Sequence, residues 1–251
     1  MQTDAIKSAR RVFEIFELFD RERRPLALKD VQQRLGYPAS SGSALLKSLV
    51  SLGYLDYDHE RRGYFPTMRI AALGAWVGAA LFGDGALTAL MERLHSVTGE
   101  TVILAVQSDL HAQYVHLIHS AEPLQFSMPP GARRPLGASG MGWVLLSAKS
   151  EAEVERLRRR FNAEGGPRVT RESLAGRIAE VRARGYAFSK HTVSEGAGVI
   201  AALLPTGPFG RAYAIGVAGP VARLERKEEA IVGEIRAGIA TLEGETPCRR
   251  P

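Results

Sequence analysis

The chain has 251 residues and a mass of 27.2 kDa, a length that suits one large domain or two modest ones. Hydrophobic residues make up 45% of it and charged residues 24%, which excludes a wholly disordered chain, and its single cysteine, Cys248, excludes an internal disulfide framework and a metal site built from cysteines. The net charge of +6 and the isoelectric point near 9.7 suit an acidic partner such as nucleic acid, but residues 1–66 carry only +2 of this excess, so net charge alone does not identify a DNA-binding segment.

The sequence predicts neither a secretion signal nor a membrane span. The first residues, MQTDAIKSARR, lack the apolar core of a signal peptide. The longest charge-free apolar run, residues 70–83, is shorter than the roughly 20 residues that cross a bilayer. We therefore expect a soluble, cytoplasmic protein with no membrane partner.

The first 66 residues show the order of a winged helix-turn-helix. Apolar residues at steps of one, three or four, interrupted by Gly36, Pro38 and Gly53, predict three helices followed by two short strands around a polar tip. These five segments are residues 5–19, 27–35, 39–52, 54–57 and 63–65.

The third of these helices is the candidate for DNA recognition, because the second helix of a helix-turn-helix pair enters the major groove. No acidic residue lies between Asp30 and Asp56, and small hydroxyl side chains at the start of the helix allow close approach and hydrogen bonds to phosphates or bases. The residues expected to contact DNA, in this region and at the hairpin tip, are Arg34, Ser40, Ser41, Ser43, Lys47, Arg61 and Arg62. The alternative is that Ser40 only caps the helix and that the charged residues are only solvated.

The pattern of residues 67–82 predicts an apolar helix rich in small residues. The pattern of the chain after this helix predicts a mixed α+β domain. Large apolar side chains on the helix must be buried against something, whether its own domains or another chain. Further helices are expected at residues 86–97, 139–147, 150–161, 170–184 and 224–242. Strands are expected at residues 101–107, 113–119, 186–189, 198–204 and 212–218, and residues 129–137 are expected to form turns.

The sequence matches no catalytic motif completely. The run GASGMG is a near miss for a nucleophile elbow around Ser139, because the elbow requires glycine where Met141 stands. His116 and His119 are three apart in a predicted strand, so they should lie on opposite faces and could not share a metal. We therefore expect no enzymatic activity, no catalytic residues, no cofactor and no metal.

Several stretches resemble the IclR family of bacterial transcription regulators. The N-terminal stretches are SARRVFEIFELF, LALKDVQQRLGYPASSGSALLKSLVSLGYLDYD and RRGYF. The second half resembles that family's effector-binding domain, which has a GAF-like fold, in the stretches GARRPLGASGMGWVLLSA, RARGYAFSKHTVSEGAGVIAALLP and YAIGVAGPVARL. The resemblance extends over residues 8–242, with one departure at Ala44, where the family often has an arginine.

The resemblance implies an α+β protein in three parts. Residues 1–66 would form a winged helix-turn-helix DNA-binding domain, residues 67–85 a linker and dimerisation helix, and residues 86–245 a GAF-like effector-binding domain. The implied partners are double-stranded DNA with a pseudo-palindromic operator, a small-molecule effector, and further copies of the chain in a dimer or tetramer.

The resemblance also implies an effector pocket. Its walls would be Phe126, Ser139, Gly140, Met141, Ser189, Ala197, Val199, Gly216 and Ala218. Residues 139–141 would lie at a helix N-terminus, where backbone N–H groups and the helix dipole favour an anion. The glycines at 137, 140 and 142 either admit a ligand close to the backbone or serve helix packing.

Four of these wall positions differ from family members that bind small polar acids. Ser189 replaces an acidic residue, Val199 a cysteine, and Gly216 and Ala218 replace serines. Because buried polar ligand atoms need partners, we expect a larger or more apolar effector, such as an aromatic or acyl acid. Two alternatives stay open: a ligand-independent DNA-binding protein with a vestigial sensor domain, and an enzyme that uses the second domain.

Overall fold

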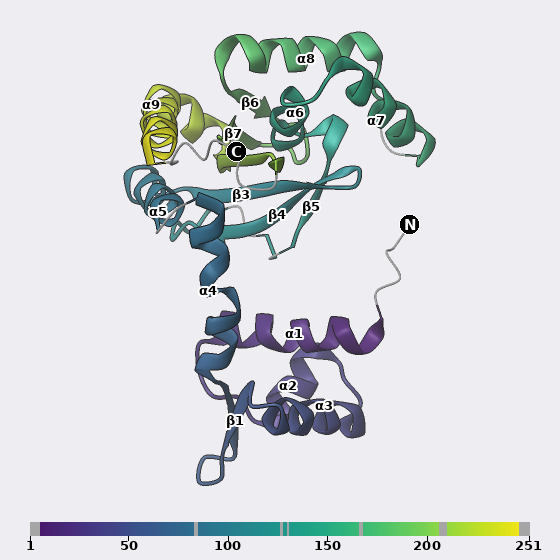
Figure 1. Ribbon diagram of the computed structural model, residues 1–251, viewed down its shortest axis with the longest axis vertical. Helices are drawn as coiled ribbons and strands as arrows, with labels where there is room; N and C mark the ends of the chain where they lie inside the picture. The colour runs from purple at the N-terminus through teal and green to yellow at the C-terminus, as the bar shows by residue number, and fades with distance from the viewer. Residues whose placement is uncertain are drawn as a thin grey trace, which may run out of the picture. The chain divides into compact units, whose positions relative to one another are not determined.

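The computed structural model describes residues 6–82, 85–125, 128–129, 131–165, 168–205 and 210–245. The chain divides into two units, Met1–Val77 and Gly78–Pro251, and each has its own core (Figure 1).

The first unit is a winged helix-turn-helix, as predicted. Its elements are α1 (Lys7–Glu22), α2 (Leu28–Leu35), α3 (Ala39–Ser51), β1 (Leu55–Asp58) and β2 (Gly63–Pro66). The two strands pair antiparallel, and Leu26 forms a β-bridge to Tyr64 on the open side of β2. Apolar side chains from all three helices and both strands form one core, with Ile15, Val31 and Leu46 fully buried.

Close packing fixes α3 against the rest of this unit. Gly36 ends α2 with a φ of +66°, a conformation that glycine adopts without strain. Gly42 lets α3 approach α2 closely, because a Cβ there would lie 3.3 Å from Cγ of Gln32. The Tyr37 hydroxyl donates to the Glu14 carboxylate on α1, so the turn between α2 and α3 is tied to the first helix.

Helix α4 (Met68–Phe82) follows the hairpin, and its start contacts the connection between α3 and β1. The Thr67 hydroxyl donates to the Gly53 carbonyl oxygen at 2.6 Å, and the Arg69 guanidinium lies over the Tyr54 ring. The side chains of Met68, Leu73 and Trp76 are exposed to solvent.

The second unit is an α+β domain around an antiparallel six-stranded sheet with strand order β5-β4-β3-β8-β7-β6. The strands are β3 (Thr101–Ser108), β4 (His111–Ile118), β5 (Arg133–Pro135), β6 (Ala187–Lys190), β7 (Ala197–Leu203) and β8 (Tyr213–Pro220). The helices are α5 (Ala86–Thr98), α6 (Gly140–Ser147), α7 (Glu151–Ala163), α8 (Arg171–Arg184) and α9 (Val221–Glu245), and a short 3-10 turn, η1 (Leu136–Ala138), precedes α6.

Helices cover both faces of this sheet (Figure 1). Alternate residues of β3 face opposite ways, so Ile103 packs in the core formed with α6, α7 and α8, whereas Val102 and Leu104 pack in the core formed with α5 and α9. The strand predicted at residues 101–107 is confirmed. Strand β5 was not predicted: residues 133–135 were expected in a turn, but they pair with β4.

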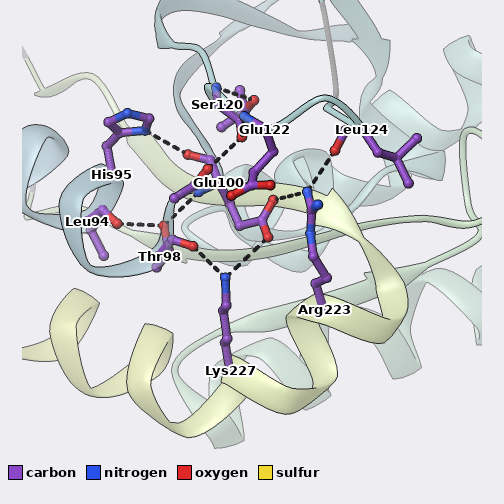
Figure 2. Close-up of polar contacts among 11 residues, drawn as sticks. Leu94, His95, Thr98, Glu100, Ser120, Glu122, Leu124, Arg223 and Lys227 are labelled. Carbon is purple, nitrogen blue, oxygen red and sulfur yellow. Dashed lines mark hydrogen bonds and ion pairs between the residues drawn. The ribbon is translucent and has the colours of Figure 1, made fainter.

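A buried carboxylate joins α5, β3 and α9 at one end of the sheet (Figure 2). Glu100 is 1% exposed, and its carboxylate accepts from Nη2 of Arg223 at 2.7 Å and lies 3.5 Å from Nζ of Lys227. Arg223 also donates to the Leu124 carbonyl oxygen, and Lys227 to that of Thr98. These contacts fix the start of α9, which directly follows the strand that carries Ala218.

Candidate functional site

The exposed face of α3 is formed mostly by small side chains and one lysine. Ser40, Ala44 and Lys47 are exposed, while Leu46 and Leu49 on the opposite side are buried in the core. The N-cap position of α3 is Pro38, so the interpretation of Ser40 as the helix cap is wrong.

The other two predicted serines of α3 are half-buried. The Ser41 hydroxyl donates to the Pro38 carbonyl oxygen at 3.1 Å. Ser43 lies one residue before the exposed Ala44, at the edge of the same face.

Arg34, at the end of α2, already has an acidic partner. Its Nη1 lies 2.5 Å from Oε1 of Glu22 on α1. The Glu22 side chain is 18% exposed and also lies 3.4 Å from Nη2 of Arg24, so this carboxylate is shared by two arginines.

The tip of the β1–β2 hairpin presents two arginines. The Asp58 carboxylate accepts from the backbone N–H groups of Glu60 and Arg61, which closes the turn and lowers the pKa of that carboxyl. Arg62 has a φ of +50°, and both arginine side chains are exposed. The hairpin therefore extends cationic side chains from the same unit as α3.

A cavity of about 40 Å³ lies between the sheet and the start of α6. The predicted residues that line it are Ser139, Gly140, Met141, Ser189, Ala197, Val199 and Ala218. Gly216 lies beneath this wall, because a Cβ there would meet Sδ of Met141 at 2.8 Å. Phe126 lies outside the described residues.

The glycines of the α6 region serve packing. A Cβ at Gly140 would lie 2.5 Å from Oγ of Ser189, and a Cβ at Gly142 would overlap the Leu136 carbonyl oxygen. Of the two interpretations of these positions, close packing of helix and strand is the one that the geometry favours.

The Ser139 hydroxyl is fully engaged at the N-cap of α6. It accepts from the Gly142 N–H at 3.2 Å and donates to the Pro135 carbonyl oxygen at 2.7 Å. It therefore orients the helix start, and any ligand contact at this point falls to backbone N–H groups of the first helical turn.

Several cavity residues were not predicted from the sequence. They are Ile103, Tyr114, Met128, Arg134, Thr192, Val193 and Gly198. Alternation along β4 could have indicated Tyr114, which follows the buried Ala112 by two residues. Arg134 required knowledge of β5, which no periodicity revealed.

Within the described ranges, no three His, Cys, Asp or Glu side chains are grouped to hold a metal ion. No helix within the same ranges has the length and hydropathy that crossing a membrane requires.

Two family models match the chain. The IclR helix-turn-helix domain matches residues 8–59, and the bacterial transcriptional regulator IclR C-terminal domain matches residues 86–241, more than half of the chain. The chain belongs to the IclR family. It is thus an IclR-type transcriptional regulator, as the resemblance implied.

Relatives and solved structures agree with this assignment to the IclR family. The chain is 27% identical over 234 residues to the transcriptional repressor IclR of Escherichia coli, covering 88% of this chain and 83% of that protein. It is 27% identical over 203 residues to the regulator XynR of the same organism, covering 78% and 79%. The effector domain of an IclR regulator from Acinetobacter sp. ADP1 has 30% identity and a TM-score of 0.59, covering 63% of this chain and 94% of that one. The IclR of Thermotoga maritima, with 14% identity and a TM-score of 0.66 over 94% and 98% of the two chains, shows the shared fold.

Proposed function

We propose that this protein is a cytoplasmic, sequence-specific DNA-binding regulator whose operator affinity changes when a small organic acid occupies the cavity of its second unit. The exposed face of α3 has no acidic side chain, and this feature supports the DNA-binding part of the proposal. Its small side chains allow the backbone to approach base edges, and Lys47 supplies a phosphate contact.

The hairpin tip supplies a second contact to the same duplex. Arg61 and Arg62 are exposed on the wing and suit an adjacent minor groove or the phosphate backbone. Together with Arg34, Ser40, Ser41, Ser43 and Lys47, they form the proposed DNA-binding set.

We propose further that the chain acts as a dimer or tetramer. The exposed Met68, Leu73 and Trp76 of α4 form an apolar surface that association of two chains would bury. A two-fold pair of DNA-binding units predicts a pseudo-palindromic operator with half-sites about one helical turn, or a multiple of it, apart.

A catalytic role for the cavity has little support. The Ser139 hydroxyl donates to a backbone carbonyl oxygen and no base lies next to it among its hydrogen-bond partners, so nothing activates it as a nucleophile. We therefore propose binding, and no enzymatic turnover, for this unit.

The experiment that tests regulation is a linkage measurement. Organic acids are screened for their effect on the melting temperature of the full chain, and the most stabilising acid is added to a titration of the chain with the duplex upstream of its own gene. Because linkage is reciprocal, the acid should change the affinity for this duplex, and the duplex should change the affinity for the acid by the same factor. If both affinities stay unchanged at saturation, the proposed regulation is wrong.

A further inference from the structure

Arg134 is the one charged side chain among the described residues that line the cavity. In the β4–β5 pair it lies opposite Ala112, a fully buried residue of the cavity-side core. Residues directly opposite one another in an antiparallel pair share a face, so Arg134 is directed to the cavity side. Its neighbour Arg133 lies opposite Gln113 and belongs to the other face.

The guanidinium of Arg134 has no acidic partner. Its Nη1 donates to the Arg133 carbonyl oxygen at 3.2 Å, and its Cζ lies 5.9 Å from the centre of the Tyr114 ring. Among the described residues, no carboxylate lies within 4.0 Å of it, whereas Arg158, Arg184 and Arg223 of the same unit all have one. The cavity therefore holds a positive charge that the rest of the described unit does not neutralise.

Two other polar side chains line the cavity. Tyr114 is 4% exposed and Ser189 is 7% exposed, and neither hydroxyl bonds to another described residue. Neither hydroxyl oxygen is among the fully buried atoms without a partner, so both oxygens open onto the cavity, where a ligand can bond to them. Burial raises the pKa of Tyr114 to about 12, so its phenol stays protonated and can donate.

The rest of the described cavity wall is largely apolar. Ile103, Met141, Val199 and Ala218 are buried, and no second cation is present among the described lining residues. A single cation suits one carboxylate, and the apolar side chains suit a hydrocarbon group beside it.

We propose that Arg134 and Tyr114 bind the carboxylate of a monocarboxylic acid, and that the hydrocarbon part of this acid lies against Ile103, Met141 and Val199. The inference rests on the proposed function, in which this cavity takes the effector. It assigns the anion contact to side chains of β5 and β4, since the Ser139 hydroxyl at the start of α6 is already engaged. Guanidinium and carboxylate form paired hydrogen bonds, which an uncharged amide cannot reproduce.

The test is a calorimetric titration of the full chain with acetate, butyrate, hexanoate, benzoate and butyramide. The variants are Arg134→Gln and Tyr114→Phe, and the matched control is Arg133→Gln, which removes the same charge one residue away on the other face. Butyrate should bind the wild-type chain and the control equally, should bind Arg134→Gln about tenfold or more weakly, and should bind Tyr114→Phe with an intermediate loss. Butyramide should not bind.

The inference is overturned if none of the acids binds, if butyramide binds as tightly as butyrate, or if Arg134→Gln retains the wild-type affinity. Arg134→Lys keeps the charge and should restore part of the binding, which separates loss of charge from damage to the fold. Discrimination between promoter and random duplex, measured without any acid, tests the DNA-binding part of the proposed function independently of these titrations.

Discussion

At the scale of single residues, Glu100 shows how a buried charge stabilises the second unit. Its carboxylate is enclosed by Arg223 and Lys227, and its position over Gly219 leaves no room for a Cβ at that glycine. Removing one partner of a buried ion pair leaves the other charge uncompensated, which is far more costly than breaking a pair at the surface.

We predict that Glu100→Gln lowers the free energy of unfolding by about 3 kcal/mol. The control is Glu225→Gln, which breaks the exposed pair with Lys190 and should cost less than about 1 kcal/mol. Urea denaturation of both variants measures the difference. Equal losses would show that the Glu100 cluster contributes no more than a surface pair.

Gly142 provides a second prediction, about packing. Alanine there places a Cβ against the Leu136 carbonyl oxygen, so Gly142→Ala should lower the free energy of unfolding by about 3 kcal/mol. Gly176 of α8 has open space around it, so Gly176→Ala should raise the same quantity by about 0.5–1 kcal/mol. A neutral Gly142→Ala would contradict the packing described for the start of α6.

At the scale of elements, the helices and most strands follow from local signals. Periodic apolar residues and the helix breakers Gly36, Pro38 and Gly53 are enough to predict the winged helix-turn-helix from the sequence. Its elements are short and follow one another directly in the chain. Strand β5 could not be found in this way. It is three residues long, and its hydrogen bonds go to β4, a segment about twenty residues away.

The missed strand explains why Arg134 was not predicted as a cavity residue. Without the register between β4 and β5, nothing in the sequence distinguishes Arg133 from Arg134, although only the second lines the cavity. Seven of the wall residues implied by family resemblance nevertheless line one cavity. They lie at the N-cap and start of α6 and on β6, β7 and β8, elements that the sequence predicts within one or two residues.

The DNA-binding surface makes a prediction at the same scale. Lys47→Ala should weaken binding to all duplexes to a similar extent, and should reduce the slope of log affinity against log salt by about 1, because one phosphate contact is lost. Arg226→Ala, on α9 in the second unit, removes one exposed charge and should change neither quantity. Fluorescence anisotropy across a range of salt concentrations provides both measurements. An unchanged slope for Lys47→Ala would remove this residue from the proposed interface.

At the scale of the whole molecule, exposed apolar side chains on α4 indicate self-association. We predict that Trp76→Glu weakens association of the chain about tenfold or more, since a large aromatic residue in such a surface often dominates its binding energy. Val97→Glu, at another exposed apolar position, on α5, is the control and should leave association unchanged. Sedimentation velocity over a concentration series measures both. A wild-type chain that remains monomeric throughout would contradict the proposed assembly.

The proposed regulation depends on two units with separate roles, one that contacts DNA and one that holds a cavity with unpaired polar groups. The most direct test of the central claim is an equilibrium titration of the full chain with the duplex upstream of its own gene and with a random duplex of equal length, at moderate salt. A sequence-specific regulator should bind the first roughly a thousandfold or more tightly than the second. Equal affinity for the two duplexes would contradict the account.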